Sequence, residues 1–233
     1  MNKDLLISSL SLRGINITEE QYSQLEDLME STLATNEKFN LTAIKDRDTF
    51  MEKMVFDSAL PLANVDLTDK SVLDLGTGAG FPGMVLYILN PKIKLTLLDS
   101  TRKKIDYLAD YCAKHNYKVN CVVARAEDFA RKNREKFDFV TARAVSELSI
   151  LMELSIPMIK VGGSLIALKS LGVEQELDNA SKAFKKLDCN IEKVYEDYLP
   201  ESNEFRATVL VKKNKVTNSK YPRDYAIIKD RKL

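Results

Sequence analysis

A glycine-rich turn between an apolar strand pattern and an apolar helix pattern constrains this chain more than any other feature. Val72–Leu75 indicates a short buried strand, and the eight residues from Gly76 to Gly83 contain four glycines. Glycine permits tight turns, positive φ and close approach of the backbone to a ligand. Met84–Leu89 then indicates a helix packed on a sheet, with Pro82 in its first turn. The pattern predicts a ligand-binding α/β fold in which backbone N–H groups of the turn are free.

Two cofactor classes compete for this turn. Gly78-x-Gly80-x-x-Gly83 matches the dinucleotide fingerprint, which binds a pyrophosphate at a helix N-terminus. Counted from Gly76, however, Phe81 stands where a third glycine is needed. The carboxylate of Asp74, in the first strand, would repel a pyrophosphate but suits a ligand with an ammonium and a sulfonium group. We therefore expect S-adenosylmethionine, with Asp74, Thr77 and the glycine turn at its methionine portion. The alternative is a turn that only connects two elements.

A carboxylate follows the second strand pattern, Lys94–Leu98. Asp99 stands where nucleotide-binding α/β folds place the group that binds ribose hydroxyls. After the third strand pattern, Val119–Val123, Ala126 and Glu127 are placed to bind an adenine edge, or Glu127 simply complements a helix dipole. Arg143 follows the fourth strand pattern, 137–141, at the ligand-binding end of the sheet. It is a candidate catalytic or cofactor-binding residue, or a structural residue of its loop.

Composition indicates one catalytic domain of ordinary globular character. The 233 residues are 45% hydrophobic and 30% charged. The three cysteines are scattered without a C-x-x-C pair, and His115 is the only histidine, so neither a disulfide framework nor a metal site is expected. No apolar run is long enough to span a bilayer and no cleavage site follows the first leucines, so we expect a cytoplasmic protein without a membrane partner.

Charge is unevenly distributed along the chain. The formal net charge is +1, but residues 206–233 carry nine basic and two acidic side chains, hence +7, against −6 for the rest. Such a segment is either an arm that contacts nucleic-acid phosphates or a solvated terminus. We expect three parts: a helical extension over 1–65, a methyltransferase domain over 66–213 and a basic tail over 214–233.

The remaining pattern predicts an α/β sheet domain preceded by helices. A capping box at Thr18 starts the main N-terminal helix, and a second helix is expected over 46–60. Further helices are expected over 102–115, 146–158 and 173–186. A turn at Gly162-Gly163 should precede a fifth strand over 164–168, and strands over 191–199 and 206–211 should form an antiparallel pair at the sheet end.

Several groups of residues resemble one known family, ribosomal RNA small-subunit methyltransferase G, also called glucose-inhibited division protein B. They occur in the family's order over nearly the whole chain and are Asn40–Ala43, Asp57-Ser58, Asp74–Gly83, Asp99-Ser100, Arg125–Glu127, Arg143-Ala144, Gly162-Gly163 and Tyr221–Arg223. The resemblance implies a class I, Rossmann-like methyltransferase with a mainly parallel seven-stranded sheet. It also implies methyl transfer from S-adenosylmethionine to N7 of a guanine in 16S ribosomal RNA.

The resemblance also implies roles for individual residues. Gly76, Phe81, Ala126, Glu127 and Arg143 are expected to contact the cofactor, and we add Gly78 of the turn to this set. The candidates for RNA contact on the 30S subunit are Asn40, Lys169 and Arg223. The chain departs from the family pattern in having Met54 for a histidine, Ser170 for a glycine, and no glycine or prolines after Arg223.

Three other functions share parts of this pattern. A small-molecule methyltransferase would have the same cofactor domain without a need for the +7 segment. A dinucleotide-dependent oxidoreductase would use the glycine fingerprint, and a noncatalytic RNA-binding module could retain the fold. If the tail contacts RNA, its deletion should spare cofactor binding. We expect a monomer.

Overall fold

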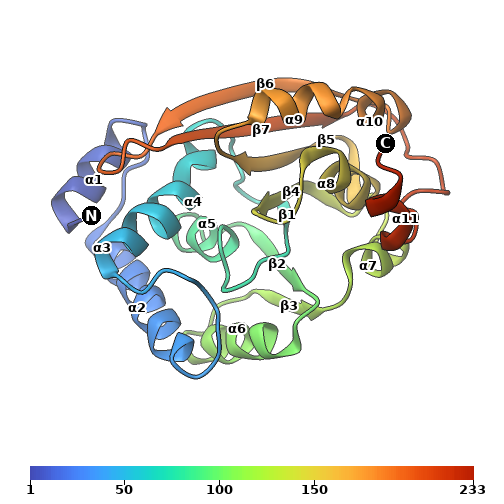
Figure 1. The fold of residues 1–233 in the computed structure, drawn as a ribbon. Helices are drawn as coiled ribbons and strands as arrows, with labels where there is room; N and C mark the ends of the chain where they lie inside the picture. The colour runs from blue at the N-terminus through green and yellow to red at the C-terminus, as the bar shows by residue number, and fades with distance from the viewer.

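The computed structural model describes residues 1–233, which form one seven-stranded sheet with helices on both faces (Figure 1). The strand order is β3-β2-β1-β4-β5-β7-β6, with β1 to β5 parallel and β7 antiparallel to both neighbours. The strands are β1 Ser71–Leu75, β2 Lys94–Asp99, β3 Asn120–Val123, β4 Phe137–Arg143, β5 Ile159–Lys169, β6 Cys189–Tyr198 and β7 Phe205–Lys213. The predicted fold class and the terminal antiparallel pair are confirmed.

Helices precede the sheet and alternate with its strands. They are α1 Lys3–Ser11, α2 Glu19–Asn36, α3 Arg47–Phe50, α4 Asp57–Ala59, α5 Gly83–Leu89, α6 Arg102–Lys114, α7 Ala126–Lys132, α8 Leu148–Ser155, α9 Val173–Asn179, α10 Ser181–Lys186 and α11 Tyr225–Asp230. The helix predicted over 46–60 is divided, because a π-helical segment, Met51–Phe56, lies between α3 and α4. Pro82 is the N-cap of α5 rather than part of its first turn. No helix has the length and apolar character needed to cross a membrane.

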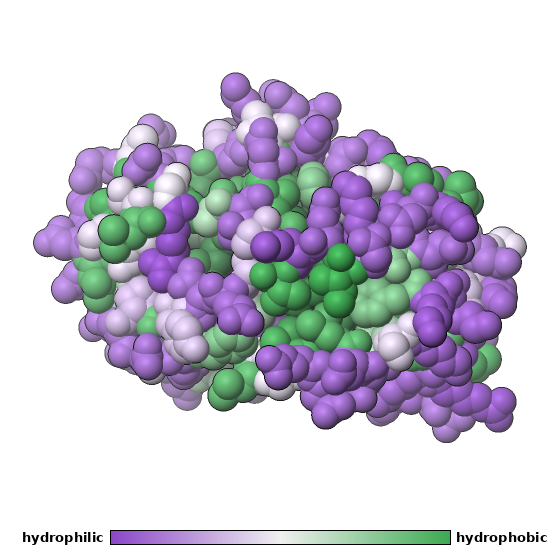
Figure 2. All heavy atoms as spheres, turned by 90° about the horizontal axis from the view of Figure 1, so that it is seen from above, coloured by the Kyte–Doolittle hydropathy of each residue, from purple (hydrophilic) through white to green (hydrophobic).

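Alternating strand residues supply two cores, one on each face of the sheet. In β5, Ile166 and Leu168 belong to the core shared with α1, α2, α5 and α6, whereas Leu165 and Ala167 belong to the core shared with α7 to α11. The N-terminal helices therefore share one core with the sheet. The two chain ends lie on opposite sides of the molecule (Figure 1). Viewed from the side of β6 and β7, the surface is mostly hydrophilic, with hydrophobic residues gathered near the middle (Figure 2).

The prediction of a turn at Gly162-Gly163 is wrong, because both residues lie inside β5. Gly162 has φ +84°, and the pairing of β5 with β4 shifts register between Phe137 and Phe139. A Cβ on Gly163 would lie 2.3 Å from the carbonyl oxygen of Asp138. The glycines therefore allow an irregular strand to approach its neighbour closely, and the strand begins five residues before the predicted 164–168.

Candidate active site

The glycine turn connects β1 to α5 at the carboxyl end of the parallel strands. Gly76, Gly78 and Gly80 all have positive φ, at +69°, +59° and +99°. The backbone N–H groups of Gly76 and Thr77 both donate to the carbonyl oxygen of Leu98, at 2.8 and 3.0 Å. The turn is thus fixed to β2 by the backbone conformation that glycine allows.

Most N–H groups of the turn are already satisfied, contrary to the expectation that they are free. Gly78 donates to Asp99 at 3.0 Å, and Gly80 and Phe81 both donate to the carbonyl oxygen of Thr77. From Gly76 to Phe81 only Ala79 has an N–H without an acceptor. A pyrophosphate site needs several converging N–H groups. The geometry therefore argues against the dinucleotide alternative.

The first N–H groups of α5 are likewise occupied. Gly83 donates to Asp74 at 2.9 Å, Met84 donates to the carbonyl oxygen of Gly80, and Pro82 has no N–H. Pro82, Gly83 and Met84 thus offer no free donor to an anion.

Asp74 holds the turn from within the protein. Its side chain is fully buried and accepts hydrogen bonds from Thr77 Oγ1 at 2.6 Å, Gly83 N at 2.9 Å and Thr141 Oγ1 at 3.1 Å. Burial raises the pKa of Asp74, and these hydrogen bonds oppose the shift. Asp74 lines neither cavity at this end of the sheet. Asp74 therefore holds the turn in shape through its hydrogen bonds, whereas the sequence predicts a direct contact with the ligand.

Two cavities open on either side of the turn. The smaller, about 200 Å³, is lined by Asp99, Ala126 and Glu127 among others. The larger, about 1010 Å³, is lined by the other expected cofactor residues, Thr77, Gly78, Phe81 and Arg143, and by Lys169. Gly76 and Val145 line both. The structure thus brings every predicted cofactor residue except Asp74 to two cavities that meet at Gly76.

The smaller cavity is polar on one side. Asp99 points one carboxylate oxygen at Gly78 N and the other at Thr101 N, at 3.0 and 2.8 Å. Glu127 lies 3.6 Å from the Arg125 guanidinium and is mostly buried. A carboxylate held by the backbone beside a second, shielded carboxylate is suited to hydroxyl and amino groups of a nucleoside.

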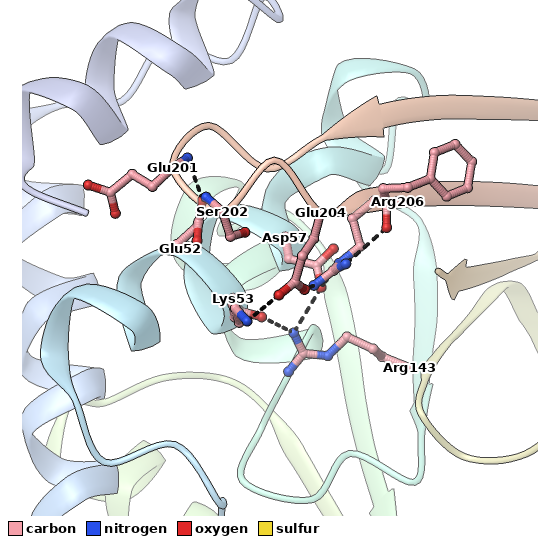
Figure 3. Close-up of polar contacts among 9 residues, drawn as sticks. Glu52, Lys53, Asp57, Arg143, Glu201, Ser202, Glu204 and Arg206 are labelled. Atoms are coloured by element: carbon pink, nitrogen blue, oxygen red, sulfur yellow. Dashed lines mark hydrogen bonds and ion pairs between the residues drawn. The ribbon is translucent and has the colours of Figure 1, made fainter. Parts of the chain in front are cut away.

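Arg143 lines the larger cavity and belongs to a polar cluster with Asp57 and Arg206 (Figure 3). Its Nη1 donates to the carbonyl oxygen of Lys53 at 2.8 Å and lies 3.5 Å from Asp57 Oδ2, and its Nη2 lies 3.1 Å from Met54 Sδ. Arg206 Nε approaches the same Asp57 oxygen at 3.2 Å. Burial raises the pKa of Asp57, although both guanidinium groups oppose the shift.

The β6–β7 turn is fastened to the N-terminal region beside this cluster (Figure 3). The buried Glu52 carboxylate accepts from the backbone N–H groups of Glu201 at 2.6 Å and Ser202 at 2.9 Å. Lys53 and Glu204 form an ion pair. One wall of the larger cavity is therefore built from two segments about 150 residues apart in sequence.

The RNA-contact candidates lie in different places. Lys169 lines the larger cavity, where its Nζ donates to Glu176 at 2.6 Å. Asn40 is exposed beside Leu41, which lines that cavity. Arg223 lines neither cavity and donates twice to the buried Glu153, at 2.7 and 2.6 Å. An RNA contact by Arg223 would compete with this ion pair.

The comparison with known proteins identifies the family. The family model described as rRNA small subunit methyltransferase G matches residues 21–200. The chain belongs to this family. Proteins named Ribosomal RNA small subunit methyltransferase G are 40% identical over 222 residues in Ligilactobacillus salivarius, covering 92% of each chain, and 40% identical over 228 residues in Fusobacterium nucleatum, covering 97% of each.

Solved structures resemble the chain in fold. A SAM-dependent methyltransferase from Aquifex aeolicus matches with a TM-score of 0.53 and 16% identity, over 77% of this chain and 97% of that one. A predicted O-methyltransferase from Agrobacterium tumefaciens matches with a TM-score of 0.55 and 17% identity, over 72% and 83%. At these identities the likeness shows the fold alone.

For this member of the rRNA small subunit methyltransferase G family, several residues that line the two cavities were not predicted from the sequence, among them Lys53, Val145, Arg206 and Tyr225. Lys53 and Val145 carry no local signal. Arg206 is counted in the charge of the 206–233 segment and starts a predicted strand, but its pairing with Asp57 was not foreseen. An arginine inside an apolar strand pattern was the signal available for it. Tyr225 lines the smaller cavity from the C-terminal segment, and no pattern in the sequence indicated this.

Proposed function

We propose that the chain transfers a methyl group from S-adenosylmethionine to N7 of a guanine in 16S ribosomal RNA. The observation that supports this most directly is the meeting of two cavities at Gly76. The smaller has the size and the carboxylates for an adenosine, and the larger has room for an amino-acid chain and a purine base. A cofactor held by the residues of these cavities would supply an electrophilic methyl group on its sulfonium.

Each part of the site then has a defined task. Asp99 accepts hydrogen bonds from the ribose hydroxyls, and Ala126 and Glu127 bind the adenine edge. The turn from Gly76 to Phe81 lies along the methionine portion, and the buried Asp74 keeps the turn in shape. Because only Ala79 offers a free N–H, the contact with the turn is mainly one of shape.

The reaction requires positioning rather than proton transfer. Guanine N7 has an in-plane lone pair and no proton, so its attack on the methyl carbon needs no general base. Holding the reacting atoms in line at about 3 Å provides the rate enhancement. The buried cluster of Asp57, Arg143 and Arg206 supports this by fixing the wall against which the base lies. We assign Lys169 and the Asn40 segment to the RNA side of the cavity.

Methyl transfer to purified 30S subunits, with a tritiated methyl group, tests the proposal. We expect label in 16S RNA and N7-methylguanine at one position, which is lost from cells without the gene. Asp99→Ala should reduce both transfer and binding of S-adenosylhomocysteine. Asp106→Ala, an exposed aspartate on α6, is the matched control and should change neither. Label that enters small molecules but not RNA would instead support a small-molecule methyltransferase.

We also propose that the protein acts in the cytoplasm as a monomer. Ribosomal RNA as the substrate supports the location. Size-exclusion chromatography with light scattering would test the monomer, and a dimer mass would contradict it.

A further inference from the structure

The basic C-terminal segment, residues 214–233, folds back onto the sheet domain. Tyr221, Ile228 and Leu233 are buried in the core that contains α7 and α8. The segment therefore has apolar side chains that hold it in place, which a free RNA-binding arm does not need.

Polar contacts fasten the same segment. Arg223 binds Glu153, whose side chain is fully buried, through its backbone N–H at 3.0 Å and through two guanidinium nitrogens. Arg131 forms an ion pair with Asp224 at 2.5 Å, immediately before α11. Release of the segment would leave the charge of the fully buried Glu153 uncompensated, so these contacts resist it.

The fastened segment brings an aromatic ring to the smaller cavity. Tyr225, the first residue of α11, is half-buried and lines this cavity together with Asp99 and Glu127. The Arg125 guanidinium lies 5.5 Å from the centroid of the Tyr225 ring, over its face. This distance is within the range of a cation–π contact, which holds the ring beside the cavity.

We propose that Tyr225 is a cofactor-binding residue that forms a wall of the adenine pocket, so that residues 214–233 complete the cofactor site. This rests on the proposed function, which places the adenine in the smaller cavity. Aromatic rings bind purine faces by stacking, and their removal commonly weakens binding at least several-fold. Since binding and segment docking are linked, S-adenosylhomocysteine should also stabilise the docked segment. The expectation that deletion of the tail spares cofactor binding is thereby replaced by its opposite.

Calorimetric titration with S-adenosylhomocysteine tests this proposal. Tyr225→Ala should weaken binding about tenfold, while Tyr225→Phe should change it less than about twofold because it keeps the ring. Ile227→Ala, on the same helix but 46% exposed, is the control and should match the wild type. The affinity for adenosine alone should fall by the same factor in Tyr225→Ala, because the ring is assigned to the adenosine portion of the ligand. Wild-type affinity in Tyr225→Ala would overturn the proposal.

A second measurement uses the unaltered protein. Trypsin cleavage after the exposed Lys215 and Lys220 should slow severalfold when S-adenosylhomocysteine is present. Equal cleavage rates with and without a ligand that binds would overturn the proposal while leaving the proposed function intact. Failure of the wild type to bind the ligand at all would instead overturn the proposed function.

Discussion

Gly76 is the position at which a single methyl group should damage the site most selectively. It has φ +69° and lines both cavities. A Cβ at this position would lie 2.7 Å from Cγ2 of Val145, closer than real Cβ contacts allow. Gly76→Ala therefore combines left-handed backbone strain with a collision at the junction of the cavities.

The two costs can be separated. Left-handed conformation in a non-glycine residue costs about 1–2 kcal/mol, and overpacking in a rigid position costs about 1–3 kcal/mol. Together they amount to about 2–5 kcal/mol, which the turn can relieve only by moving. At about 1.4 kcal/mol for each tenfold change, S-adenosylhomocysteine should bind at least about 30-fold more weakly. Adding Val145→Ala to the Gly76→Ala variant removes the collision. It should therefore restore only the part of the affinity lost through overpacking.

A double-mutant cycle tests this: Gly76→Ala, Val145→Ala and the double variant are compared with the wild type by isothermal calorimetry and thermal unfolding. Gly14→Ala is the matched control, because Gly14 has φ +77° and no atom within 4 Å of an added Cβ. It should lose about 1 kcal/mol of stability through strain alone and keep the wild-type affinity. The reasoning is refuted if Gly76→Ala binds the ligand like the wild type, or if Val145→Ala restores nothing.

Two further predictions concern buried and half-buried carboxylates. Asp57→Ala should lower the free energy of unfolding in urea by about 3–5 kcal/mol, since it leaves Arg143 and Arg206 without their shared partner; a loss below about 1 kcal/mol would contradict this. At Asp138, burial raises the pKa, but hydrogen bonds from Lys160 and the start of β1 outweigh it and lower the pKa to about 2. Its ionised form therefore stabilises the fold above pH 4 and loses this effect as the pH falls from 4 to 2. Because the carboxylate is partly solvated, Asp138→Asn should lower the free energy of unfolding by only about 1 kcal/mol at pH 6. In urea unfolding, the stability difference between wild type and variant should shrink towards pH 2. A difference that stays constant with pH would exclude this assignment.

The sheet was predictable because its signals are local. Apolar runs such as Val72–Leu75 form parallel strands buried on both faces, and the turns and carboxylates that follow them in sequence lie at one sheet edge by topology. Asp99, Ala126 and Glu127 therefore reached one cavity as expected. Strand order alone therefore brings together those site residues that directly follow the strands in sequence.

The remaining features depend on contacts between distant segments. Nothing local shows that Glu153 in α8 binds Arg223, so the tail's charge suggested a free arm. Nor does a local pattern show that Thr141 and Gly83 surround Asp74 and turn its carboxylate away from the cavities. At Gly162-Gly163, the same residue type that makes turns instead permits an irregular strand. Only the tertiary structure distinguishes the two.

The wall built from Glu52, Lys53 and the β6–β7 turn has a consequence for biosynthesis. Its N-terminal half is synthesised first, but it acquires its partners, Glu201, Ser202 and Glu204, only after nearly nine-tenths of the chain has been made. Domains fold as units during synthesis, and contacts this distant in sequence form late. The larger cavity therefore gains this part of its wall only after residues 201–204 have been synthesised. We therefore expect no methyl transfer from chains that end before residue 204, which lack this part of the wall.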